Sequence, residues 1–229
     1  MGTSIAGEPV PEHAAERRLG VRWALVSIGT LVFVGALAVL AIAAAPTAST
    51  ATIKWTGASS TAWSEAANWE DTSDDTNRTP TSTDDVYIPS GTPNEPTFTS
   101  NAASVSADTI NTMTVESGAT LTVSSGTLTV AAGSGSQDAL IAGALDLSGG
   151  TLELSAGSGS DVEVTGTLTL DSGTVRGGSL SGAGSVGVGA NTITLDAMTL
   201  NTSVDFTAAG GTLRVVNGLQ LDATIELSG

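Results

Sequence analysis

Three aspartates follow strand-like segments in the second half of the chain and are candidates for binding calcium. Asp171, Asp196 and Asp222 each come directly after a short apolar-x-apolar unit. If these units stack, the carboxylates stand in a line at strand spacing, where like charges repel unless solvent or a cation lies between them. The more ordinary role of an Asp at such a position is an Asx turn in solvent. No other cofactor is suggested by the sequence.

Three tryptophans near the start of the chain are candidates for binding a carbohydrate ligand. Trp55, Trp63 and Trp69 could present indole faces on which sugar rings stack. Aromatic residues make up only 3% of the chain, however, so the same three side chains could build a small hydrophobic core instead. Both roles stay open at this point.

Nucleophilic and general-base chemistry that depends on cysteine or histidine is unavailable to most of the chain. Cysteine is absent, which excludes disulfides, thiolate catalysis and Cys-based zinc sites. The sole histidine, His13, precedes a long apolar run that separates it from the rest. Glu153 and Arg176 occupy equivalent outward positions of neighbouring repeats, so they are expected to form a surface ion pair worth less than about 1 kcal/mol. We predict no catalytic residues.

Residues 1–48 have the features of an export segment. Arg17, Arg18 and Arg22 precede an uncharged apolar run at residues 23–45. This run is longer than a typical signal core and close to the length that spans a bilayer. Residues 1–48 are therefore predicted to be a cleaved signal peptide or a retained membrane anchor. The positive-inside tendency then places the remainder outside the cell or at its surface.

Composition divides the exported part into two regions. Residues 49–103 hold all the remaining tryptophans, the tyrosine and most of the prolines, together with a cluster of aspartates, and we expect them to form a cap. Residues 104–229 consist of apolar-x-apolar units separated by Gly, Ser and Ala. Such alternation is typical of short strands with one buried face.

The second region repeats itself about every two dozen residues. Successive copies begin at nearly constant intervals with Thr127, Thr151, Thr174, Thr199 and Thr224. Each copy contributes three strand units, which together describe one coil of a parallel β-helix whose stacked coils share an interior. A left-handed helix built on hexapeptides would repeat at a shorter interval. We therefore predict an all-β, right-handed parallel β-helix with an N-terminal cap.

The beginning of this helix resembles bacterial surface β-helix proteins. The resemblance rests on "KWTGASSTAWSEAANWEDT", "TDDVYIPSGTPNEP" and "INTMTVESGATLTVSSGTLTV", which together span residues 54–130. The proteins it resembles are autotransporter passengers and haemagglutinin-like adhesins. The resemblance implies that residues 49–103 cover the first coil.

Charge and architecture together point to a structural role. The formal net charge of −16 repels nucleic-acid phosphates, which excludes nucleic-acid binding. The expected function is a non-catalytic stalk or adhesive fibre segment at the cell surface, with other surface proteins or carbohydrate as partners. The membrane would be a further partner through residues 23–45 if that segment is retained. The last coil, near "ATIELSG", is expected to offer an open strand edge for end-to-end stacking.

Two alternative functions remain. One is a carbohydrate-active β-helix enzyme, a polysaccharide lyase or a glycoside hydrolase that uses paired carboxylates. The other is an ice-binding surface, because threonine recurs in outward pairs along one predicted face. These pairs are Thr120 with Thr122, Thr167 with Thr169, and Thr192 with Thr194.

Overall fold

The computed structural model describes residues 50–99, 109–131, 138–154, 161–206 and 210–227. All of them belong to one compact unit, Ala45–Gly229. The predicted signal or anchor segment 1–48, with its apolar run 23–45, lies outside the described residues. Within the described ranges, no helix has both the length and the apolar character needed to cross a membrane.

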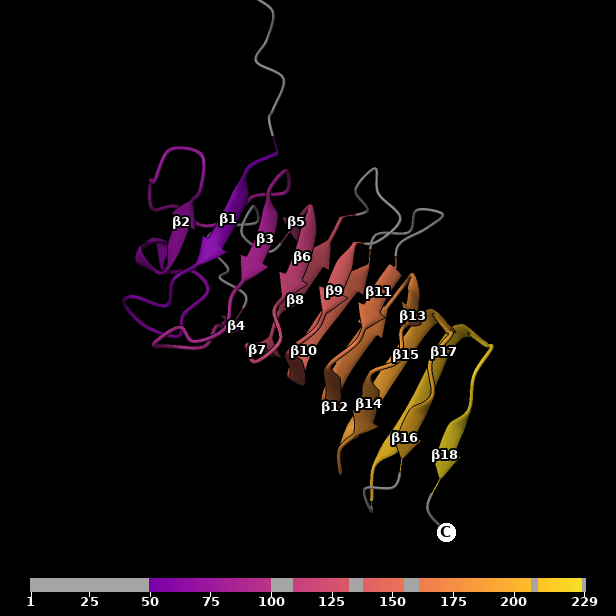
Figure 1. Cartoon of the computed structure of the whole chain (residues 1–229). Helices are drawn as coiled ribbons and strands as arrows, with labels where there is room; N and C mark the ends of the chain where they lie inside the picture. The colour runs from indigo at the N-terminus through magenta and orange to yellow at the C-terminus, as the bar shows by residue number, and fades with distance from the viewer. Residues whose placement is uncertain (1–49, 100–108, 132–137, 155–160, 207–209, 228–229) are drawn as a thin grey trace, which may run out of the picture. The chain divides into compact units, whose positions relative to one another are not determined.

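The described residues form an all-β solenoid (Figure 1). The strands are β1 (Thr52–Trp55), β2 (Trp69–Asp71), β3 (Asp85–Ile88), β4 (Thr97–Thr99), β5 (Thr109–Ile110), β6 (Thr112–Val115), β7 (Thr120–Ser125), β8 (Thr127–Val130), β9 (Ala139–Ile141), β10 (Ala144–Leu154), β11 (Asp161–Val164), β12 (Thr167–Arg176), β13 (Ser179–Ser181), β14 (Ser185–Val188), β15 (Thr192–Leu200), β16 (Val204–Phe206), β17 (Thr212–Leu221) and β18 (Ile225–Leu227). In the same residues, the one helical element is a short 3-10 turn, η1 (Ala66–Asn68).

Successive strands of the chain pass in rotation through three parallel sheets. The first sheet contains β1, β3, β6, β9, β11, β13 and the second halves of β15 and β17. The second sheet contains β4, β7, the first halves of β10 and β12, and then β14, β16 and β18. The third sheet contains β5, β8, the second halves of β10 and β12, and the first halves of β15 and β17. This arrangement confirms the predicted β-solenoid.

The interior of the solenoid is one continuous stack of aliphatic side chains. Alternate residues of each strand face inward, which is why the period-two pattern of the sequence buries every second residue. On the second sheet, Leu121, Leu145 and Leu168 lie in register and are fully buried. A single turn has too few apolar residues to shield itself from water, so its stability depends on the turns stacked against it.

The turns become shorter toward the C-terminal end. On the second sheet, Leu121 pairs with Leu145 and Leu145 pairs with Leu168, so each of these turns takes about two dozen residues. Leu168 then pairs with Val186, and Val186 pairs with Val204, which makes these turns about a quarter shorter. The predicted repeat of about two dozen residues is therefore confirmed for the earlier turns and wrong for the later ones.

The shorter turns change which threonines stack. Thr127, Thr151 and Thr174 lie in register on the third sheet, as the sequence predicted. Thr174 then pairs with Thr194, whereas Thr199 lies on the first sheet. The predicted alignment failed because apolar-x-apolar units look alike on all three sheets. Thr199 stands about two dozen residues after Thr174, as expected, but it begins a unit of the first sheet.

The predicted cap region, residues 49–103, is continuous with the predicted repeats, residues 104–229. Strands β3 and β4 pair in parallel with β6 and β7, so they already belong to the first and second sheets. Strand β2 departs from this pattern by pairing antiparallel with β1. The structure thus does not separate a cap domain, and the change in composition reflects larger side chains within one solenoid.

Candidate functional site

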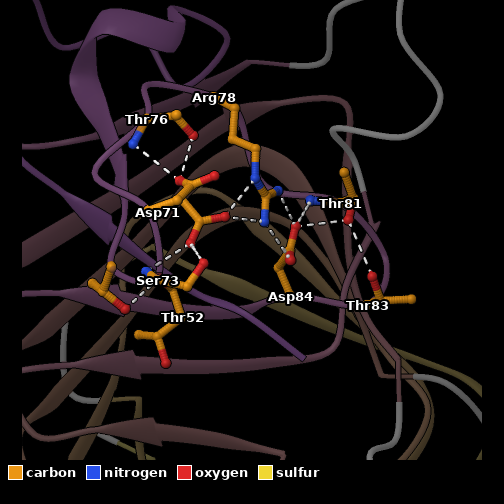
Figure 2. Close-up of polar contacts among 10 residues, drawn as sticks. Thr52, Asp71, Ser73, Thr76, Arg78, Thr81, Thr83 and Asp84 are labelled. Atoms are coloured by element: carbon orange, nitrogen blue, oxygen red, sulfur yellow. Dashed lines mark hydrogen bonds and ion pairs between the residues drawn. The ribbon is translucent and has the colours of Figure 1, made fainter. Parts of the chain in front are cut away.

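A polar cluster between β2 and β3 joins two nearly buried aspartates, and we call Asp71, Arg78 and Asp84 the arginine clasp. The side chains of Asp71 and Asp84 are only 6% and 3% exposed. Arg78 lies between them (Figure 2) and donates from Nη1 and Nη2 to the two oxygens of Asp84, at 2.6 and 2.9 Å. Its Nε donates to Asp71 Oδ2 at 2.8 Å. A bidentate pair of this kind fixes the orientation of both groups.

The carboxylate oxygens of the clasp also accept hydrogen bonds from neighbouring residues. The backbone nitrogen and hydroxyl of Ser73 donate to Asp71 Oδ1 at 2.9 and 2.6 Å. The backbone nitrogen and hydroxyl of Thr81 donate to Asp84 Oδ2 at 2.8 and 2.6 Å. Each oxygen of the two carboxylates has a donor within the chain. The clasp therefore holds the loop that connects β2 to β3, rather than offering free oxygens to a ligand.

These hydrogen bonds keep the clasp charged. For Asp71, the bonds from the Ser73 hydroxyl and backbone lower the pKa and outweigh the effect of burial, and Arg78 lowers it further. For Asp84, burial raises the pKa, but the bonds from Arg78 and Thr81 outweigh it and the net shift is downward. The bond with Asp84 is the main cause that raises the pKa of Arg78. Two carboxylates and one guanidinium therefore remain ionised together at neutral pH.

The three tryptophans predicted to bind a ligand are core residues. Trp55, Trp63 and Trp69 are at most 1% exposed. The ring of Trp69 meets those of Trp63 and Trp55 edge to face, with centroids 4.6 and 4.8 Å apart, and Trp63 meets Phe98 in the same way. Trp55 Nε1 donates to the carbonyl of Asn94 at 2.7 Å. Sugars cannot reach these faces, so the ligand-binding prediction is wrong and the scarcity of aromatic residues was the better signal.

The three aspartates predicted to bind calcium stand at three different corners of the solenoid. Asp171 lies between the two halves of β12, Asp196 ends the third-sheet half of β15, and Asp222 follows the first-sheet half of β17. The predicted line of carboxylates is wrong, because the turns shorten between these residues. Each accepts a hydrogen bond from an amide instead: Asn191 to Asp171 (3.1 Å), Asn217 to Asp196 (2.6 Å) and Gln220 to Asp222 (2.7 Å). No three His, Cys, Asp or Glu side chains of the described ranges are grouped to hold a metal ion.

A polar ladder crosses the third sheet where the sequence predicted an ion pair. Glu153 and Arg176 lie in register, with Oε2 and Nη1 3.6 Å apart, which confirms that prediction. On its other side, Arg176 Nε donates to Asp196 Oδ2 at 3.2 Å. The side chain of Arg176 is 49% exposed, so solvent screens both contacts and each adds little stability.

The threonine pairs considered for ice binding do not form one array. On the second sheet, Thr122 and Thr169 belong to the same outward column, but Asp146 lies between them. Thr194 lies on the third sheet, in register with Thr174. A charged side chain inside the column and the division between two sheets interrupt the regular hydroxyl spacing that such a surface would need.

A shallow hollow lies at the corner where the first sheet passes into the second, in the last turns. It consists of two adjoining depressions of about 320 and 460 Å³ that share Ala183, Gly184 and Ser203. Asp205 and Glu226 line one depression and lie in register on β16 and β18. Sequence reasoning missed this pair, although "VDF" and "IEL" place an acidic residue at the centre of two similar units.

Two features of the described residues thus invite a functional interpretation. One is the hollow beside Asp205 and Glu226, and the other is the regular, continuous stack of turns. No family model, no curated protein and no solved structure matches this chain, so a function has to be argued from its geometry.

Proposed function

We propose that the chain is a structural or adhesive segment of a cell-surface protein, acting as a stalk or fibre element without a catalytic role. The observation that carries this proposal is the continuous pairing of strands from β1 to β18 around a single aliphatic interior. Every turn is hydrogen-bonded to its neighbours on three sides, which makes such an array stiff along its axis.

The outward side chains suit an extracellular setting. The net charge of −16 keeps such a rod soluble and separates it from anionic surfaces. In this proposal residues 1–48 direct export or anchor the chain, with residues 23–45 in the membrane if they are retained. Other surface proteins or carbohydrate would be the partners of the exposed faces.

Two finer features belong to the same proposal. The solenoid is right-handed, because connections between parallel strands of one sheet are right-handed in about 98% of cases. The tryptophan cluster closes the N-terminal end of the interior. Supporting this, β2 pairs antiparallel with β1 and so ends the parallel ladder on that side.

Force spectroscopy of the full chain tests the mechanical role. Pulled from its two ends, a stalk of stacked turns should resist and then lose one turn at a time. The observed turn lengths predict increments of about 60 to 95 Å each, the shorter ones from the C-terminal turns. Extension at negligible force, without discrete steps, would contradict a load-bearing role.

The alternative that the geometry favours next is a carbohydrate-active enzyme. Asp205 and Glu226 are register partners beside the hollow, and parallel neighbours stand about 4.8 Å apart, close to the roughly 5 to 5.5 Å between the carboxyl groups of retaining glycosidases. We expect the full chain to release neither reducing ends nor unsaturated products from a panel of acidic and neutral polysaccharides.

Matched variants make this assay decisive. Glu226→Gln removes one carboxylate of the pair, and Asp222→Asn removes an exposed carboxylate of the other depression. If product appears with the unaltered chain and is lost with Glu226→Gln but kept with Asp222→Asn, the enzyme replaces the stalk as the better proposal.

A further inference from the structure

The last described turn exposes side chains that face inward. Val215 and Leu221 of β17 are each 45% exposed, and Leu227 of β18 is 75% exposed. Their register partners in the preceding turn are buried: Leu195, Leu200 and Phe206. Within the described residues, the aliphatic interior is thus open to solvent at this end.

The backbone at this end is open as well. Within the described part of the chain, β17 pairs with β15 and β18 pairs with β16, and neither has a strand on its other side. Exposed edges are usually protected by lysine or proline, yet β17 and β18 contain neither residue. Arg214 and Glu226 are the only charged residues of these two strands, and an edge that is otherwise uncharged favours the addition of another strand.

We propose that this end binds the same end of a second copy, forming a two-fold dimer in which β17 pairs antiparallel with β17 of the other copy. The sequence of β17, TLRVVNGLQL, supports this because its pattern reads alike in both directions around Asn217. Leu213 and Leu221 are equally distant from Asn217, and so are Val215 and Leu219. An antiparallel strand centred on Asn217 therefore opposes inward apolar residues with inward apolar residues.

The path of β17 fits such an axis. The strand turns a corner at Asn217 and Gly218, where φ is positive, and passes from the third sheet to the first. A two-fold axis through this corner, perpendicular to the axis of the solenoid, exchanges the first and third sheets of the two copies. The same axis pairs β18 antiparallel with β18 of the second copy. Glu226 lies at the centre of this pair, so Ile225 of one copy stands opposite Leu227 of the other. All three sheets thereby continue across the junction.

This register sets Glu226 of the two copies opposite each other, which costs some stability, but it also brings opposite charges together. Arg214 would stand opposite Gln220 and diagonal to Asp222 of the second copy, a separation that a long side chain spans. In the described part of the chain Arg214 makes no ion pair, although acidic residues outnumber basic ones 23 to seven. Because the contact is symmetric, the Arg214 and Asp222 pair occurs twice in each dimer.

Sedimentation velocity of the full chain, in a density-matched nonionic detergent, tests the proposal. A dimer is expected at micromolar concentration, and Val215→Lys should weaken it at least tenfold by placing charge in the apolar contact. Thr167→Lys, on an outward position of β12, is the matched control and should leave the dimer unchanged. Val215 is already exposed, so the substitution should not unfold the chain, which circular dichroism checks.

Charge exchange and crosslinking address the register itself. Arg214→Asp and Asp222→Arg should each weaken the dimer, and the double variant should restore it. Since the chain has no cysteine, Glu226→Cys adds a single thiol at the two-fold axis and should form a disulfide-linked dimer on oxidation, whereas Thr167→Cys should not.

Three results would overturn the dimer. They are a monomer at all concentrations, a ladder of larger species as head-to-tail stacking would give, and a dimer that Val215→Lys leaves intact. The dimer does not depend on the proposed stalk function, because a monomeric solenoid can still bear load and the force experiment is read out separately.

Discussion

Arg78→Ala should lower the free energy of unfolding of the N-terminal turns by about 3 to 5 kcal/mol, because it leaves two buried carboxylates without their counter-charge. Asp71 and Asp84 are almost inaccessible to water, which could otherwise compensate them. Urea unfolding followed by tryptophan fluorescence measures this loss locally, since Trp55 and Trp69 belong to the strands β1 and β2 that this loop adjoins.

Arg176→Ala is the matched control. Arg176 also lies between two carboxylates of neighbouring strands, but Glu153 and Asp196 are 34% and 17% exposed, so its loss should cost less than about 1 kcal/mol. Equal losses for the two arginines would contradict the special role of the clasp.

The pH dependence of the same variant gives an independent check. The pKa values of Asp71 and Asp84 are lowered on folding, so their stabilisation is complete above the unfolded value of 3.8 and declines as the pH falls below it. Without Arg78, Ser73 still lowers the pKa of Asp71, but Asp84 keeps only the bonds from Thr81 to offset its burial, so the loss of stability in acid should be smaller in the variant. Parallel pH profiles for the two proteins would contradict this account.

Gly166→Ala is the second substitution with a large expected effect, a loss of about 3 kcal/mol through overpacking. A methyl group at Gly166 would overlap the backbone oxygens of Gly143 and Ala142 in the preceding turn, and would lie 2.7 Å from the Ala142 carbonyl carbon. Backbone atoms at a corner cannot move aside without disturbing the strands on both sides. Thermal unfolding measured by circular dichroism should show the loss.

Gly187→Ala provides the comparison. A methyl group at Gly187 meets nothing within 4 Å, and its φ is not in the left-handed region. We expect a change within about 0.5 kcal/mol, with a slight gain if the unfolded chain loses freedom. Similar losses at Gly166 and Gly187 would show that a glycine at either position matters for flexibility and not for the close approach of turns.

The strands and their stacking could be predicted from the sequence because they depend on local alternation. Leu145 and Leu147 indicate an inward face, and the recurrence at Leu168 and Leu170 indicates the next turn. The step from Leu168 to Val186 could not be predicted, because Val186 stands about two dozen residues after Val162 of the first sheet and so fitted the repeat in the wrong column. Turn length is set by corners of Gly, Ser and Ala, which carry no periodic signal.

The candidate sites were harder to predict than the strands, for a related reason. Glu153 and Arg176 were paired correctly because both belong to the regular repeat. The clasp was missed because Asp71, Arg78 and Asp84 meet through an irregular loop whose path no pattern in the sequence specifies. Sequence reasoning therefore succeeded where regular strands position the side chains.

The shortening of the turns restricts how this kind of chain can grow by duplication. The segment between Leu145 and Leu168 is longer than the one between Leu168 and Val186. A copied wide segment inserted among the narrow ones would have surplus backbone to bulge out at a corner, whereas a copied narrow segment would match the circumference of its neighbours. Lengthening by gene duplication or by design is thus expected to succeed only when the copied turn has the same number of residues as the turns beside which it is inserted.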